Sequence, residues 1–279
     1  MAPPKSFDLR VNGIRLRCQD WGGHGRPILL VHATGMMALL YAPIARALTS
    51  AGQVLSYDQR GHGDSDHPPD AAYDWEHQLA DLHALIKALG LRELRGVGHS
   101  GGATILAALS AQEPALISRL VMVEPVLIGQ PPAVENPLVQ STLRRRASFT
   151  DAAEMYRHFA GKPPYDSWQP ELLRAYCEEG AAWDPQGRWR LKCPPEIESS
   201  FYRLELRFQT LRRVLGCRAP ALVIFGTRGN RSTGAAHALT LKRALPQVEI
   251  VTMAEYGHLI AMENPDLIAQ MALDFLARP

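Results

Sequence analysis

Acidic residues are missing from one long stretch of this sequence, because no Asp or Glu occurs between Leu206 and Val248. The stretch contains an apolar run that leads into a glycine-containing loop, APALVIFGTRGNRST at residues 219–233. Loops that follow buried strands often carry functional side chains. Any chemistry that needs a carboxylate must therefore draw it from another part of the chain.

Long apolar segments are also missing. No run of 18 apolar residues occurs, which argues against a membrane-spanning helix, and the first residues, MAPPKSFDLRVNG, lack the apolar region of a signal peptide. The few cysteines show neither a CxxC pair nor a metal-like spacing, so we interpret them as reduced thiols of a cytoplasmic protein, with disulfides as the minor alternative. They are Cys18, Cys177, Cys193 and Cys217.

The charge balance and the motifs exclude further classes of partner. A net charge of +2 is too small to indicate nucleic acid or an anionic membrane surface. The basic runs at 144–146 and 212–213 have no interleaved aromatics and are typical of solvated helix faces. No nucleotide-binding glycine motif is present, and His62, Asp64 and His67 lack the setting of a metal site. We predict no cofactor and no metal.

Short apolar runs alternate with helical patterns, which predicts the α/β class. Asn12-Gly13 indicates a hairpin between residues 7–11 and 14–17. Further strands are predicted at 28–32, 54–58, 94–99, 120–124, 221–226 and 248–253, and helices at 41–50, 73–89, 101–113, 234–245 and 264–277. Such alternation favours a mostly parallel sheet with helices on both faces.

Residues 128–216 break this alternation. The segment is rich in Pro, Arg and aromatic residues and shows no clear strand, whereas 170–180 and 196–215 look helical. We therefore predict a helical cap at 128–216, inserted into a core made of 1–127 and 217–279. Its aromatics include Tyr165, Trp168, Trp183 and Trp189.

Residues 98–102, Gly-His-Ser-Gly-Gly, follow a strand pattern and precede an apolar helix pattern. A sharp strand-to-helix turn would hold Ser100 in a strained conformation above a helix N-terminus, where N–H groups favour negative charge. Glycines at 98 and 102 would admit the close approach of neighbouring backbone. This context favours a nucleophilic serine, although a serine that only caps the helix has the same local pattern.

Four sequence blocks together carry a resemblance to a known family. They are HATG at 32–35, DQRGHGDSD at 58–66, GHSGG at 98–102 and YGHLIAMENP at 256–265. In this order the chain resembles the α/β-hydrolase family over nearly its whole length. The resemblance implies the α/β-hydrolase fold, an eight-stranded sheet flanked by helices, with a helical cap after the sixth strand.

The resemblance also implies roles for single residues. Ser100 would be the nucleophile and His258 the base, since an imidazole can take up and return a proton near neutral pH. The oxyanion hole would be formed by the main-chain N–H groups of Thr34 and Gly101. His32 would orient the loop of Thr34. The block at 58–66 would be structural, with Asp58 and Arg60 pairing across its turn.

The third catalytic group is the unusual one. The family's usual acid would fall at Gly229, which carries no carboxylate. Some branches, including lactonases and dehalogenases, place the acid at the end of the sixth strand, where this chain has Glu124. We therefore predict Glu124 as the acid, with a structural role at the cap junction as the alternative. Glu255 is too close to His258 in sequence, and Asp64 and Asp66 lie in the wrong loop.

These residues predict hydrolysis of a carboxylic ester or lactone through an acyl-enzyme. Perhydrolysis, C–C bond cleavage, or non-catalytic binding on the same fold remain alternatives. We expect a small apolar or aromatic substrate, contacted by Met36, Trp168, Trp183 and Trp189. No membrane or nucleic-acid partner is expected, and nothing in the sequence indicates the oligomeric state.

Overall fold

The computed structural model describes residues 3–128, 136–204, 208–228 and 236–278. An eight-stranded sheet has the order β1-β2-β4-β3-β5-β6-β10-β11. Its strands are β1 (Lys5–Val11), β2 (Ile14–Gly22), β3 (Ile28–Val31), β4 (Val54–Tyr57), β5 (Leu94–His99), β6 (Ile117–Val123), β10 (Ala221–Gly226) and β11 (Val248–Met253). Strands β1 and β2 are antiparallel to their neighbours, and the other pairs are parallel.

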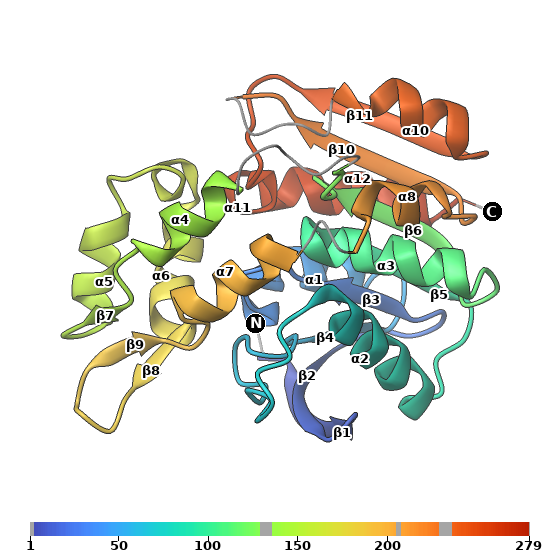
Figure 1. Ribbon diagram of the computed structural model, residues 1–279. Helices are drawn as coiled ribbons and strands as arrows, with labels where there is room; N and C mark the ends of the chain where they lie inside the picture. Colours follow the sequence, from blue (N-terminus) through green and yellow to red (C-terminus); the bar gives the residue numbers. More distant parts are fainter. Residues whose placement is uncertain (1–2, 129–135, 205–207, 229–235, 279) are drawn as a thin grey trace.

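Helices cover both faces of this sheet (Figure 1). Leu29 and Val31 of β3 belong to one buried cluster with residues of α2 (Trp75–Ala88), α3 (Gly101–Gln112) and α10 (Ala238–Ala244), whereas Ile28 and Leu30 belong to a second cluster with residues of α1 (Ala42–Leu48) and α12 (Pro265–Leu276). Successive strand residues point to opposite faces, so this strand is apolar throughout. The fold class predicted from the alternating pattern is confirmed.

The predicted elements agree with the observed ones to within a few residues at most ends. Strands β5, β10 and β11 have the predicted bounds, whereas β1 and β2 extend beyond the predicted hairpin. The helix predicted from residue 234 begins at residue 238 as α10, and residues 229–235 lie outside the described part of the chain. Apolar runs with sharp polar borders therefore locate the strands well.

Between β6 and β10, several elements lie together at one side of the sheet, on the left in Figure 1. They are α4 (Pro137–Leu143), β7 (Ser148–Phe149), α5 (Ala152–Phe159), η2 (Tyr165–Ser167), α6 (Pro170–Glu179), β8 (Ala181–Trp183), β9 (Trp189–Leu191) and α7 (Pro195–Leu204). The sheet β7-β9-β8 corrects the prediction that this segment contains no strand. Strands of two or three residues are too short to show alternation.

Two contacts tie this segment to the core. Phe149 and Trp168 belong to the same buried cluster as Ile44 of α1 and Ile268 of α12. Helix α8 (Thr210–Leu215), which the sequence assigned to the cap, packs on α3 through residues that include Val214. The inserted segment and the core therefore share continuous apolar packing.

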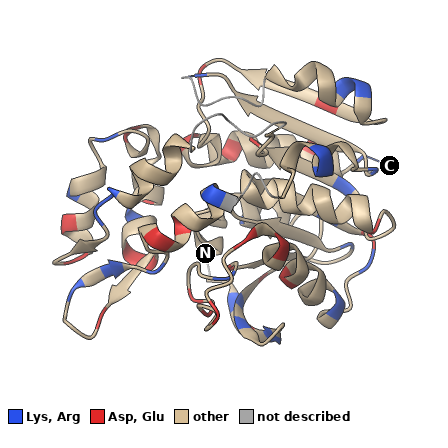
Figure 2. Cartoon of the chain, in the orientation of Figure 1, with Lys and Arg blue, Asp and Glu red and all other residues tan. Residues whose placement is uncertain are grey.

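Charged residues of both signs are scattered along the chain (Figure 2), in keeping with the net charge of +2. The four cysteines are buried free thiols. Among the described residues, no helix is both long and apolar enough to cross a membrane.

Candidate active site

Ser100 lies at the turn between β5 and α3, with φ 52° and ψ −118°. A positive φ is unfavourable for a residue with a side chain, so the turn is held by its surroundings. A Cβ at Gly98 would lie 2.5 Å from the Cα of Ala103, and one at Gly102 would lie 2.4 Å from the carbonyl oxygen of Val31. Both glycines are therefore required by the close approach of other backbone.

His258 lies in the loop between β11 and α11 (Ile260–Glu263) and reaches Ser100 from the carboxyl side of the sheet. Its Nε2 is 3.0 Å from the Oγ of Ser100. The imidazole is 33% exposed. This geometry suits a base that takes the serine proton and remains accessible to water.

Glu124 directly follows β6, and its carboxylate completes a hydrogen-bonded chain. Its Oε2 lies 3.0 Å from Nδ1 of His258, and its Oε1 accepts from the N–H of Gly226 at the end of β10. The side chain is 3% exposed. Like Ser100, it has a positive φ, 50°. Two acceptor contacts on a buried carboxylate fix its orientation toward the imidazole.

Thr34 and Gly101 lie next to each other. A Cβ at Gly101 would be 2.8 Å from the Oγ1 of Thr34. Within the described residues, neither main-chain N–H donates to a protein acceptor. Gly101 is the first residue of α3, so its N–H also lies at the positive end of a helix. The two groups are available to an oxyanion formed beside Ser100.

Two buried histidines form hydrogen bonds with the loop that carries Thr34. His32 accepts from the N–H of Gln59 through Nε2 at 2.9 Å, and its Nδ1 lies 2.8 Å from the carbonyl oxygen of Ala33. His62 accepts from the N–H of Gly35 at 3.0 Å. Burial lowers the pKa of His32 well below its usual value and that of His62 to about 4. Both rings are therefore neutral and serve as fixed hydrogen-bond partners.

The block at 58–66 corrects one predicted contact. Arg60 does not pair with Asp58, because its guanidinium forms a buried two-pronged bond with Asp81 of α2, at 2.7 and 2.8 Å. Asp58 instead accepts from the N–H groups of Ala38 and Asp64, at 2.8 and 2.9 Å, and burial raises its pKa to about 6. The block is structural, but it connects to α2 and to the loop after Thr34.

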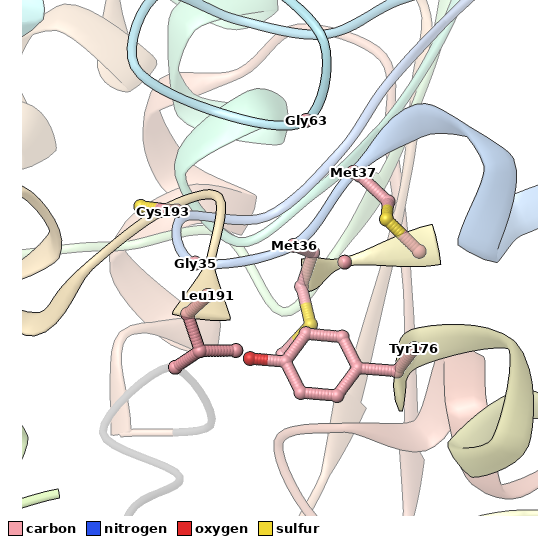
Figure 3. A pocket seen from close by; sticks show the side chains of 8 residues that line it. Gly35, Met36, Met37, Gly63, Tyr176, Leu191 and Cys193 are labelled. Carbon is pink, nitrogen blue, oxygen red and sulfur yellow. The ribbon is translucent and has the colours of Figure 1, made fainter. Parts of the chain in front are cut away.

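Met36 faces a small pocket between this loop and the inserted segment (Figure 3). The pocket is lined by Gly35, Met36, Met37, Gly63, Tyr176, Gly180, Leu191 and Cys193. Its side chains are those of two methionines, one cysteine, one leucine and one tyrosine, and the other lining residues are glycines. Met36 lies two residues from Thr34, but neither Ser100 nor His258 lines this pocket, so contact of Met36 with the substrate stays a prediction.

The three tryptophans lie in different surroundings. Trp168 is buried and packs against Tyr165 and Tyr176, with ring centroids 5.1 and 5.7 Å apart. Trp189 donates from its indole nitrogen to a main-chain carbonyl and packs on Trp183, which is 60% exposed. Trp168 and Trp189 thus pack inside the segment and Trp183 lies at its surface, and contact of these three side chains with the substrate stays a prediction.

A buried ion pair near the site was not expected from the sequence. Arg145 and Glu198, which are 53 residues apart, form two contacts, one of them 3.2 Å long. The Glu198 carboxylate lies against the loop after Thr34, since a Cβ at Gly35 would be 2.8 Å from both its oxygens. No local pattern links residues so far apart, so only the fold reveals the pair.

No group of three or more metal-ligating side chains is found in the part of the chain that the structure describes. The arrangement instead joins a hydroxyl, an imidazole and a carboxylate. The three come from the ends of β5, β11 and β6. The chemistry that this arrangement can perform is nucleophilic attack by Ser100 with proton transfer through His258.

Comparisons with known proteins identify the family and the fold. The sequence model of the alpha/beta hydrolase family matches residues 28–271. The sn-1-specific diacylglycerol lipase ABHD11 of Mus musculus is 27% identical, and the alignment covers 98% of this chain and 88% of the lipase. N-formylmaleamate deformylase of Pseudomonas putida is also 27% identical, and the alignment covers 98% of this chain and 96% of the deformylase. The crystal structure of E-2-(acetamidomethylene)succinate hydrolase superposes with a TM-score of 0.82 at 23% identity, covering 99% and 100% of the two chains.

Proposed function

The chain belongs to the alpha/beta hydrolase family, and from that premise we propose that it hydrolyses a carboxylic ester or lactone through an acyl-enzyme. The observation that carries the proposal is the unbroken chain from Ser100 through His258 to Glu124, with both contacts of the imidazole at 3.0 Å. A binding protein without catalysis would not need to hold these three groups in line.

In the proposed mechanism, the Oγ of Ser100 attacks the acyl carbonyl while Nε2 of His258 takes its proton. Glu124 stabilises the imidazolium cation through Nδ1–H. The N–H groups of Thr34 and Gly101 donate hydrogen bonds to the developing oxyanion, and each such donor is worth about 3–4 kcal/mol of barrier. His258 then protonates the leaving oxygen and later activates the water that releases the acid.

An oxygen leaving group is the chemistry that we propose first. Its support is the acid position after β6, which the sequence shares with some lactonases of the family, and the similarity to a lipase. Cleavage of a C–N bond is the second candidate, because one equally similar relative is a deformylase. Perhydrolysis and C–C cleavage would use the same three groups and are weaker candidates.

We further propose that residues 128–216 form a cap over the site and that the acyl group is apolar or aromatic. Support comes from the pocket beside Met36, where this segment meets the loop of Thr34. Its lining includes two methionines, a leucine and the tyrosine at 176. Such a surface favours apolar substrate groups over charged ones.

The test is steady-state hydrolysis of p-nitrophenyl butyrate, a panel of five- and six-membered lactones, and matched N-formyl amides. Ester or lactone turnover that disappears in Ser100→Ala is the expected result. Faster turnover of the amides than of the esters and lactones would show that C–N bond hydrolysis is the preferred reaction. Equal slow rates for the wild type and Ser100→Ala would contradict a serine hydrolase and favour the binder.

A further inference from the structure

Two buried polar side chains next to the site belong neither to the triad nor to the oxyanion hole. His99 is the last residue of β5, directly before Ser100, and Tyr41 is the last residue of the short helix η1 (Ala38–Tyr41). Both are 2% exposed. Buried polar groups of this kind almost always have hydrogen-bond partners, and the identity of those partners shows what the groups hold in place.

Tyr41 and His99 form a hydrogen-bonded chain of three links. The N–H of Ala33 donates to the Tyr41 hydroxyl at 3.1 Å, the hydroxyl lies 2.6 Å from Nδ1 of His99, and Nε2 of His99 lies 2.8 Å from the main-chain oxygen of His258. Because a carbonyl can only accept, Nε2 of His99 carries the hydrogen. Nδ1 then accepts from the hydroxyl, whose oxygen accepts from Ala33.

This assignment of donors and acceptors requires a neutral ring at position 99. Burial and the nearby His258 lower the pKa of His99 to about 3. The ring therefore stays neutral over the pH range in which a serine hydrolase works. Its two nitrogens keep opposite roles, so the chain runs in one direction and has no alternative arrangement.

The two ends of the chain are the loops that carry catalytic groups. At one end, Ala33 precedes Thr34, and the carbonyl oxygen of Ala33 contacts Nδ1 of His32 at 2.8 Å and accepts from the N–H of Met36 at 3.1 Å. That carbonyl and the N–H of Thr34 belong to one planar peptide and point in opposite directions. Fixing the peptides on both sides of Ala33 thus aims the Thr34 N–H. At the other end lies the backbone of His258.

We propose that Tyr41 and His99 are positioning residues that hold the oxyanion loop and the His258 loop at a fixed separation across the Ser100 turn. The proposal rests on the proposed acyl-transfer function of the same site. It assigns a role to the residue before the nucleophile that does not involve contact with substrate. A displacement of about 1 Å at such groups can reduce the rate about a hundredfold, because the reacting atoms must meet in one narrow geometry.

The chain offers a matched control for removal of the Tyr41 hydroxyl. Tyr57 of β4 is also buried, and its hydroxyl has no partner in the described part of the chain. Tyr41→Phe and Tyr57→Phe therefore remove the same atom from two buried sites, one linked to the active site and one not. Any general effect of the change on core packing appears in both variants.

The experiment measures reaction of Ser100 with a small alkyl fluorophosphonate, which needs the nucleophile, the base and the oxyanion hole but no natural substrate. Labelled sites are counted by mass spectrometry, and p-nitrophenyl butyrate turnover is expressed per labelled site. We expect Tyr41→Phe to lower the second-order labelling rate and kcat about tenfold, with KM changed less than about twofold. Tyr57→Phe should match the wild type.

A double-mutant cycle with His99→Gln tests whether the two residues act as one unit. We expect the Tyr41→Phe/His99→Gln enzyme to be no slower than the slower single variant, because either change breaks the same chain. Labelling and kcat of Tyr41→Phe within twofold of Tyr57→Phe would overturn the proposal, as would fully additive losses. A wild type whose Ser100 is not labelled would overturn the proposed function itself, which is a different outcome.

Discussion

The ends of two neighbouring strands, β6 and β10, perform opposite tasks in this molecule. Strand β6 is followed by Glu124, whose carboxylate contacts His258 at 3.0 Å. Strand β10 ends in Gly226, which supplies no side chain but donates its N–H to that carboxylate. The usual acid position would come after β10, at Gly229, which lies outside the described residues. The comparison shows that the end of β10 holds a carboxylate that follows β6, which we propose as the catalytic acid.

The largest effect should follow removal of the carboxylate from β6. Glu124→Ala leaves the imidazole without the group that fixes its tautomer and stabilises its cation, so kcat for p-nitrophenyl butyrate should fall about 10⁴-fold. Glu255→Ala is the matched control, because Glu255 is close to His258 in sequence but exposed. A Glu124→Ala enzyme near wild-type activity, or a large loss in Glu255→Ala, would remove Glu124 from the triad.

The second prediction is that a carboxylate placed after β10 can partly replace that of Glu124. Adding Gly229→Asp to Glu124→Ala places a carboxylate at the family's usual position, and we expect kcat to rise at least tenfold above that of Glu124→Ala. Gly229→Asn in the same background is the control, because it has the same shape without the charge. Equal activity of the Asp and Asn variants would mean that residue 229 does not reach the imidazole.

The sequence predicted the parts of the site that rest on local pattern. Ser100 was predicted from a turn with glycines on both sides between a strand and a helix pattern, and Glu124 from the resemblance to family members whose acid follows the sixth strand. The parts that it did not predict depend on distant partners. Arg60 had an acidic residue two positions away, yet it pairs with Asp81 across the fold. Nothing in sequence spacing distinguishes these two carboxylates, because only the packing of α2 brings Asp81 to the guanidinium.

The third prediction tests the close approach that β10 permits. A Cβ at Gly226 would lie 2.5 Å from the carbonyl oxygen of Tyr256 and 2.6 Å from that of Gly257. Gly226→Ala must therefore push away the loop that carries His258. We expect kcat to fall about ten- to hundredfold and the free energy of unfolding to fall by about 1–3 kcal/mol. Both are measured on the same preparation, by turnover and by urea denaturation.

Gly161→Ala is the control for this substitution, since a Cβ at Gly161 would meet nothing within 4 Å and the residue has no positive φ. It should leave kcat and stability almost unchanged. If Gly226→Ala lost stability but kept kcat, the loop would have moved as a unit with its imidazole, and Gly226 would matter for packing alone. The close approach of Gly226 to the loop of His258 would then have no part in catalysis, and only the N–H donated to Glu124 would connect the end of β10 to the site.

The smallest effect should come from the charge that follows β10. Arg228 donates to the carbonyl oxygen of Glu255 at 2.8 Å and to the carboxylate of Glu263 at 2.7 Å. The guanidinium is 49% exposed, so water weakens this pair. Arg228→Met should lower the free energy of unfolding by about 1 kcal/mol and change kcat less than twofold. Arg278→Met is the control, because it removes an arginine from the more exposed ion pair with Glu249 and shows how much such a substitution alone changes stability and kcat. A tenfold loss of kcat in Arg228→Met alone would show that β10 contributes a catalytic charge as well as a supporting N–H.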